Sequence, residues 1–152
     1  MARHSKVWEL REDMRPLLKK VKKLFPTMLG HVRTHRILLC SFMSKTSAHL
    51  AKIHTNRYPW CIALPQYDYV IQFHSSRFDN ERTSFKLMVM LNELYYIPEG
   101  GFDKDDRKHY RKLRKHNTQD FTSMLQAYGL RHEKVKKIYA GERYFLRKVE
   151  KK

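Results

Sequence analysis

The sequence predicts a small α+β domain in which a short sheet packs on one central apolar helix, with basic extensions at both ends. A length of 152 residues suits one domain, and a hydrophobic content of 41% supplies enough apolar surface for a core. Runs rich in apolar and β-branched residues at 37–42 and 69–74 have the length and composition of strands. The segment after residue 79 repeats apolar residues at helical spacing, which predicts the central helix.

The first half of the chain is predicted to hold two helices and two strands. Apolar residues recur every three or four positions over 5–25, which predicts an amphipathic helix that ends at Pro26. A strand is expected over 37–42, a short helix over 47–53 and a second strand over 69–74. The two strands supply the short sheet of the predicted fold.

The second half is predicted to be mainly helical. Asp79 is the expected N-cap of the central helix, which should be the most buried helix and should stop at Pro98. The charged segment 103–115 is predicted to form a surface helix, and 118–128 another helix with one apolar face. A hairpin is expected across 135–149.

The charge of the chain is large and unevenly distributed. Lys and Arg outnumber Asp and Glu by 32 to 15, which gives a formal net charge of +17. Residues 37–102 carry six basic and five acidic side chains, whereas 1–36 carry ten and three, 103–116 seven and three, and 131–152 nine and three. So large a net charge repels itself unless a polyanion is bound, and a nearly neutral body with basic flanks fits a phosphate-binding protein.

The sequence also favours one compartment. No stretch reaches the roughly 18 uncharged apolar residues that a membrane span requires, and the first residues lack the apolar region of a secretory signal. We therefore expect a soluble, cytoplasmic protein with no membrane partner. Cys40 and Cys61 stand among apolar neighbours without CxxC spacing, which predicts two reduced core thiols and neither a disulfide nor a metal site.

Several motifs follow one another in an informative order. The strand at 68–74, Asp-Tyr-Val-Ile-Gln-Phe-His, precedes Arg-Phe-Asp at 77–79. The apolar helix then ends with Leu-Asn-Glu-Leu-Tyr-Tyr-Ile-Pro at 91–98. Further on come Leu-Arg-Lys-His-Asn-Thr-Gln-Asp-Phe at 113–121 and Ala-Tyr-Gly at 127–129.

Over roughly residues 35–130, this succession resembles the metallopeptidase family found in phages and archaea. The resemblance implies a zincin-like fold. It divides the chain into a basic N-terminal helix at 1–30, a metallopeptidase-like core at 31–130 and a basic C-terminal extension at 131–152.

The family's metal motif has changed in this chain. In H-E-x-x-H, two imidazoles four residues apart bind one metal from one helical face, and the glutamate activates the metal-bound water. The matching positions here are Asn92, Glu93 and Tyr96, and the resemblance implies that His116 corresponds to the third ligand. An amide is a poor zinc ligand and a neutral phenol a worse one, so we expect neither metal nor catalysis. Glu93 is then a helix carboxylate paired with a nearby Arg or Lys, and Asn92 and Tyr96 hydrogen-bond across the former metal cavity.

Basic side chains interleaved with aromatic ones predict a nucleic-acid-binding protein. Guanidinium groups fork onto phosphates, and aromatic faces such as that of Tyr110 stack on unpaired bases. The predicted contacts are Lys19, Lys20, Lys22, Lys23, Arg107, Lys108, Arg111, Lys112, Arg114, Lys115, Lys136, Lys137, Arg143, Arg147 and Lys148. RNA is favoured over DNA because no groove-reading module is visible, and structured RNA in a ribosome-like particle is the expected partner.

Two other functions remain open from the sequence. One is an active zinc-dependent peptidase with Glu93 as general base, in which His116, Asp105, His109 and Asp120 rebuild a metal site. The other is a structural protein that binds acidic proteins. Stoichiometric zinc would distinguish the peptidase from a nucleic-acid-binding protein. A complex that survives nuclease treatment would distinguish the structural protein from a nucleic-acid-binding protein.

Overall fold

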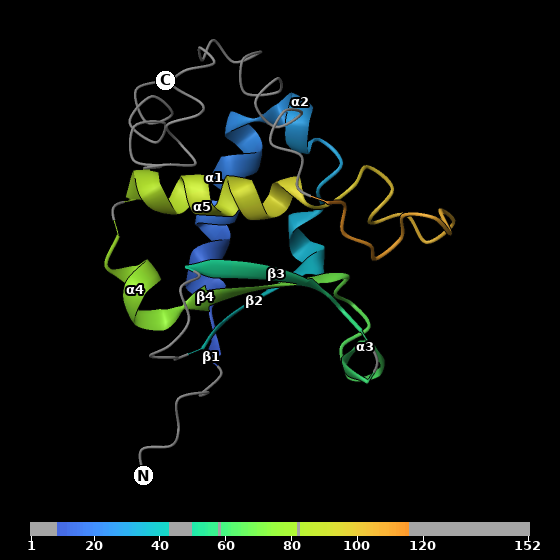
Figure 1. Cartoon of the computed structure of the whole chain (residues 1–152), viewed down its shortest axis with the longest axis horizontal. Coiled ribbons are helices and arrows are strands. Elements are labelled where there is room, and N and C mark those ends of the chain that lie inside the picture. Colours follow the sequence, from blue (N-terminus) through green and yellow to red (C-terminus); the bar gives the residue numbers. More distant parts are fainter. Residues whose placement is uncertain (1–8, 43–49, 58, 82, 116–152) are drawn as a thin grey trace.

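The computed structural model describes residues 9–42, 50–57, 59–81 and 83–115. Within these ranges the protein has two layers, a four-stranded sheet and a group of helices on one face of it (Figure 1). The predicted α+β class is confirmed, and the arrangement is consistent with a small zincin-like domain.

The sheet has a parallel centre and antiparallel edges. Its strands lie in the order β1 (Glu9–Leu10), β2 (Ile37–Phe42), β4 (Tyr69–His74) and β3 (Ala51–Thr55). β2 and β4 pair in parallel, whereas β1 is antiparallel to β2 and β3 is antiparallel to β4. The two strands predicted from the sequence are confirmed with the predicted bounds, and they form the central pair.

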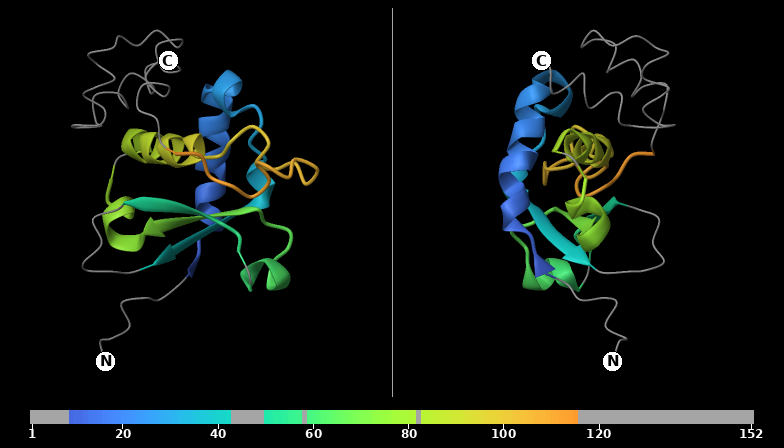
Figure 2. Two further views of the ribbon diagram at one scale, coloured as in Figure 1. Left: turned by 45° about the vertical axis from the view of Figure 1, so that its right-hand side comes forward. Right: turned by 90° about the vertical axis from the view of Figure 1, so that its left-hand side faces the viewer.

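Helices cover one face of the sheet. α1 (Arg15–Leu24), α2 (Pro26–Leu29) and α5 (Thr83–Tyr95) lie together on this face, as Figure 2 shows. α5 packs on β3 and on α1. The shorter helical elements are η1 (Glu12–Met14), η2 (Thr34–Arg36), α3 (Trp60–Ala63) and α4 (Ser75–Asp79).

The hydrophobic core lies between the two layers. Leu18 and Val21 of α1, Ile71 of β4, and Leu91 and Leu94 of α5 are almost fully buried there. Since α1 and α5 share this core, the first helix is part of the folded body. Burial of the central helix agrees with its apolar composition.

The helix predicted over 5–25 is wrong in its first described part. Residues 9–10 form strand β1, and α1 begins only at Arg15. Pro16 lies in the first turn of α1, where the missing N–H and the fixed φ of proline are tolerated. A helix continuous from residue 5 would place this proline in its interior, where it breaks the backbone hydrogen bonding.

Asp79 is not the N-cap predicted for the central helix. α4 ends at Asp79, and α5 begins four residues later at Thr83. The Asp79 carboxylate accepts a hydrogen bond of 2.9 Å from Arg11, whose buried guanidinium also donates to Asp13. This long-range ion pair holds the β1 end of the chain against α4. α5 itself ends at Tyr95, three residues before the predicted stop at proline.

The short helix predicted over 47–53 is wrong where the structure describes it. Residues 51–55 form β3, in which Ala51 and Ile53 are buried and Lys52 is exposed. This alternation has the period of two that a half-buried strand requires. Residues 47–49 lie outside the described residues.

The surface helix predicted over 103–115 is also wrong, because this segment is a succession of turns. The Asp103 carboxylate accepts the backbone N–H of Asp105, and the Asp106 carboxylate accepts those of Lys108 and His109. Such local bonds offer the backbone an alternative to helix. The positive φ of 53° at Arg111 interrupts any helical path as well.

Other sequence predictions fall partly or wholly beyond the described ranges. The helix over 118–128 and the hairpin across 135–149 lie outside them. Among the described residues, no helix is both long enough and apolar enough to cross a membrane. Cys40 is a buried free thiol, and burial raises its pKa to about 11, whereas Cys61 is a half-buried free thiol.

Candidate functional site

Glu93 lies inside the molecule, next to the edge of the sheet. Its side chain projects from α5, and the residue is 8% exposed. Glu93 Oε1 accepts a hydrogen bond of 3.0 Å from the backbone N–H of Ile53 in β3. The Leu50 carbonyl accepts from the His74 N–H of β4, and the Asn56 N–H donates to the carbonyl of Asp68, which precedes β4. Every second residue of an antiparallel strand bonds to the same neighbour, so the N–H of Ile53 points away from β4. The carboxylate thus joins the helix to the outward-facing side of the edge strand.

Asn92 and Tyr96 accompany Glu93 at the end of α5. Asn92 Nδ2 donates to Glu93 Oε2 over 3.3 Å, so the amide and the carboxylate are hydrogen-bonded to each other. Burial raises the pKa of the Tyr96 phenol, and the negative charge of Glu93 raises it further. The phenol therefore stays protonated at neutral pH, near the buried carboxylate of Glu93.

A second buried carboxylate organises the other end of the sheet. Asp68 precedes β4 and is fully buried. It accepts hydrogen bonds from Arg36 Nη2 at 3.0 Å, from Arg111 Nε at 2.9 Å and from the Tyr110 hydroxyl at 2.8 Å. Burial alone would raise the pKa of Asp68, but these three donors outweigh burial and lower it. Asp68 therefore fastens the turns after α5 to the start of the sheet.

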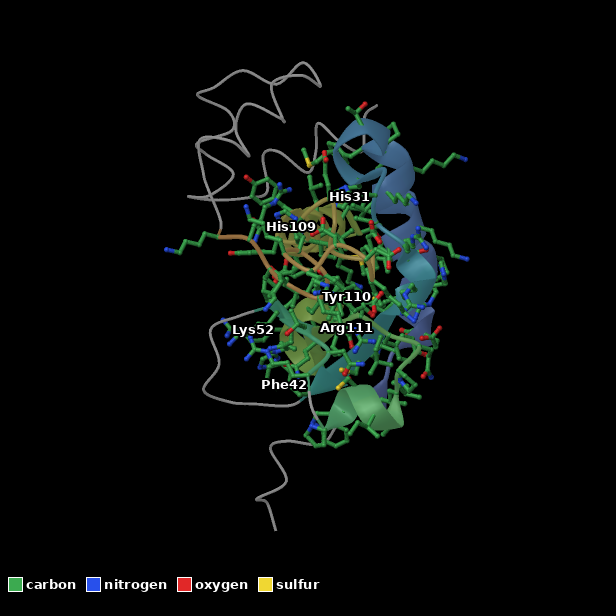
Figure 3. The ribbon with its side chains drawn as sticks, turned by 90° about the vertical axis from the view of Figure 1, so that its right-hand side faces the viewer. His31, Phe42, Lys52, His109, Tyr110 and Arg111 are labelled. Atoms are coloured by element: carbon green, nitrogen blue, oxygen red, sulfur yellow. The ribbon has the colours of Figure 1, made fainter. Side chains whose placement is uncertain are left out.

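Arg111 and Arg114 are held by further contacts within the protein. Arg111 Nη2 donates to the backbone carbonyls of Pro65 and Tyr67, at 3.0 Å each. Arg114 Nε donates to the carbonyl of Tyr95, and its guanidinium lies 4.3 Å from the centre of the Tyr95 ring. Figure 3 shows Arg111 and Tyr110 in the middle of this side of the molecule. These cations are built into the fold, and whether they also contact nucleic acid stays a prediction.

Other predicted contact residues are open to solvent. α1 has the sequence RPLLKKVKKL, with five cationic and no acidic side chains. Lys19, Lys20 and Lys23 are exposed, and Lys22 is half-buried. In the turns after α5, the exposed predicted contacts are Arg107, Lys108, Lys112 and Lys115. The structure therefore leaves two groups of cations accessible to a polyanion. The other predicted contacts lie outside the described residues: Lys136, Lys137, Arg143, Arg147 and Lys148.

A family model described as "Putative phage metallopeptidase" matches residues 6–141. The chain belongs to this family. It matches no curated protein and no solved structure. Membership in the phage metallopeptidase family raises the question of whether the helix carrying Glu93 could still hold a metal ion.

The donors at the helix motif do not fit zinc. Asn92 offers an amide that already bonds to Glu93, and Tyr96 offers a phenol whose raised pKa disfavours the metal-binding phenolate. Within the described ranges, no three His, Cys, Asp or Glu side chains come close enough together to hold a metal ion. His116 lies outside these ranges, although the Arg114 N–H two residues before it bonds to the Tyr96 carbonyl at 2.8 Å.

The residues suggested for a rebuilt metal site are only partly described. His109 Nδ1 lies 3.0 Å from Asp106 Oδ2, so this imidazole has a carboxylate partner within its own turn. Asp105 is exposed, and Asp120 lies outside the described residues together with His116. A rebuilt site therefore stays a prediction.

Two features of this region have no counterpart among the sequence predictions. The bond from Ile53 to Glu93 joins residues 40 positions apart, and no local pattern indicates it. The sequence places Asp68 in the strand motif at 68–74 and predicts no partner for it. A carboxylate placed directly before a buried strand was the available signal, because such a group needs cationic partners.

Proposed function

We propose that this member of the phage metallopeptidase family binds nucleic acid and does not hydrolyse peptides. It binds RNA in preference to DNA. The RNA is structured and belongs to a ribonucleoprotein particle such as the ribosome. The observation that carries the proposal is α1, whose exposed lysines lie on a rigid, core-packed helix without a single acidic side chain. The ammonium groups of these lysines repel one another, and bound phosphates neutralise this repulsion.

The state of Glu93 supports the same proposal. A general base must be free to take a proton from the attacking water. Here both carboxylate oxygens accept hydrogen bonds, from the Ile53 N–H and from Asn92. With an amide and a phenol at the two motif positions, the site is better suited to holding α5 against the sheet than to activating water.

Salt-dependent binding tests the proposal. Fluorescence anisotropy with labelled RNA and DNA hairpins should show binding that weakens steeply as salt increases. The triple variant K19Q/K20Q/K23Q should lower the log–log salt slope by about 2 to 3, because each lost phosphate contact removes about 0.7–0.9. K52Q removes one exposed lysine from β3 and is the matched control, with a change of at most about one contact. Salt-independent binding, or none to either nucleic acid, would refute the proposal.

The second candidate is an active zinc-dependent peptidase. Two points favour it: Glu93 is a buried carboxylate on α5, and the sequence resemblance assigns it the role of the family's catalytic glutamate. Elemental analysis of the purified protein separates the two candidates. One zinc per chain that is lost in H116A, together with chelator-sensitive hydrolysis of casein that is lost in E93Q, would establish the peptidase in place of the proposed binding protein.

A further inference from the structure

The connection between β3 and β4 carries an exposed apolar tip. α3 presents Trp60, 67% exposed, and Ile62, 68% exposed, within one helical turn. Among the described residues, Leu10 is the one other large hydrophobic side chain that is comparably exposed. Figure 1 shows α3 beyond the end of the sheet, away from the layer of α1 and α5. Residues two positions apart on a helix do not face each other, so Trp60 and Ile62 project to different sides of α3. The exposed indole of Trp60 is the candidate contact.

The tip is held in place by buried polar groups. Asn56 is 5% exposed, and its Nδ2 donates to the carbonyls of Leu64 at 2.9 Å and Tyr67 at 2.8 Å. The Asn56 backbone N–H bonds to the Asp68 carbonyl at 2.9 Å. Arg111 adds its bonds to the far end of the connection. Trp60 is therefore displayed on an anchored loop, so binding through it does not require ordering the backbone first.

The segment that carries the tip has one exposed cation and no acidic residue. The segment 56–67 contains Arg57 and no acidic residue, and Arg57 is exposed. The nearest carboxylate in sequence, Asp68, is fully buried between two guanidinium groups and is not presented to solvent. Arg57 lies three residues before Trp60 in the turn that the bond from the Cys61 N–H to the Arg57 carbonyl closes at 3.0 Å, and its Nε donates to Thr55 Oγ1 at 2.9 Å. An exposed indole and an exposed guanidinium in one turn, on a chain of net charge +17, are complementary to a ligand that has both phosphates and flat aromatic faces.

We propose that α3 is a base-stacking site, at which the Trp60 indole stacks on an unpaired nucleobase and Arg57 contacts the adjoining phosphate. This inference rests on the proposed function and narrows it, because a base can stack on α3 only in a single-stranded loop or end of the nucleic acid. α1 then contributes affinity through phosphates, and α3 contributes the preference for unpaired nucleotides.

Tryptophan fluorescence gives a direct readout. The chain has two tryptophans, Trp8 and Trp60, so W8F leaves Trp60 as the single indole emitter. Titration of W8F with a 12-residue oligouridine should quench this emission, because stacking places the base against the indole. A 12-bp RNA duplex and inorganic polyphosphate, which offer charge without unpaired bases, should bind without quenching. Equal quenching by polyphosphate would overturn the stacking site.

Affinity measurements complete the test. W60A should weaken oligouridine binding about 5- to 100-fold, the effect expected for one lost stacking contact, and should leave the salt slope and polyphosphate binding unchanged. W60F should retain most of the affinity, since a phenyl ring can still stack. L10A removes an equally exposed apolar side chain elsewhere and is the matched control.

The outcomes distinguish the two proposals. If neither oligouridine nor polyphosphate binds, the proposed function itself fails. If both bind and W60A binds oligouridine as well as the parent protein does, the function stands and the stacking site is wrong. If W60A instead abolishes self-association in sedimentation experiments while leaving RNA binding intact, α3 is a surface for a second copy of this chain and the proposal is overturned.

Discussion

Removing the charge of Asp68 should destabilise the protein strongly. D68N keeps the size of the side chain but leaves the guanidinium groups of Arg36 and Arg111 without their shared carboxylate. Breaking a buried ion pair from one side costs about 3–5 kcal/mol, and we expect the lower end because both arginine side chains are 20% exposed and regain some water. At roughly 2–4 °C per kcal/mol, a loss of about 3 kcal/mol lowers Tm by about 6–12 °C.

Urea unfolding followed by circular dichroism measures this loss. D105N, which neutralises an exposed carboxylate in the neighbouring turns, is the control and should change stability by less than about 0.5 kcal/mol. Trypsin should also cleave D68N faster after Arg111, because that side chain loses its anchor to the sheet. A stability of D68N within about 1 kcal/mol of the parent protein, with unchanged trypsin cleavage, would refute the structural role of Asp68.

The pH dependence provides an independent check. The pKa of Asp68 is lowered in the folded protein, so the unfolded state binds the proton more readily. The stabilisation is complete above the unfolded pKa of about 3.9 and is lost as the pH falls through the lower, folded pKa. The stability difference between the parent protein and D68N should therefore be constant from pH 5 to 8 and shrink below about pH 4.

Three further predictions concern other buried groups. E93A should destabilise the protein by about 1–3 kcal/mol in urea unfolding, because a backbone N–H of the edge strand loses its acceptor; an unchanged midpoint would contradict the proposed role of Glu93 in the fold. In the native protein at pH 8, Cys40 should resist Ellman's reagent because burial raises its pKa to about 11, so C61S should show no fast-reacting thiol until it is unfolded. Burial lowers the pKa of His31 in the folded protein. The contribution of the neutral imidazole to the free energy of unfolding is therefore present above the unfolded pKa of about 6.5 and is lost as the pH falls through the folded pKa. H31Q can still donate to the backbone carbonyl that His31 contacts, and it should therefore lose less stability than the parent protein between pH 7 and 5.

The parts of the fold that the sequence predicts well are those determined by local composition. β2 and β4 are mostly apolar runs of strand length, and composition predicts their bounds. The apolar spacing of the central helix is likewise a local pattern, and it predicts α5. At 103–115 the charge pattern predicts a helix, but the Asp side chains compete for the backbone N–H groups and the segment forms turns.

The candidate site was predicted less completely because its decisive contacts are long-range. The identity of Asn92, Glu93 and Tyr96 is visible in the motif, but the bond from Glu93 to the edge strand is not. Arg111 looks like any other cation of a basic run until its partner Asp68, 43 positions away, is known. The exposure of Trp60 likewise depends on which face the connection turns to solvent, and a four-residue apolar segment does not specify that.

The strand order has a consequence for how the chain folds as it is synthesised. β2 and β3 are consecutive in sequence but are separated in the sheet by β4, which is made after both. A nascent chain that ends before residue 69 therefore holds two strands whose shared neighbour does not yet exist. The competing structure is a hairpin of β2 with β3, and β4 must displace or pre-empt it to complete the sheet. Slow insertion of this middle strand, with its parallel pairing across about 30 residues, is expected to limit the rate of folding.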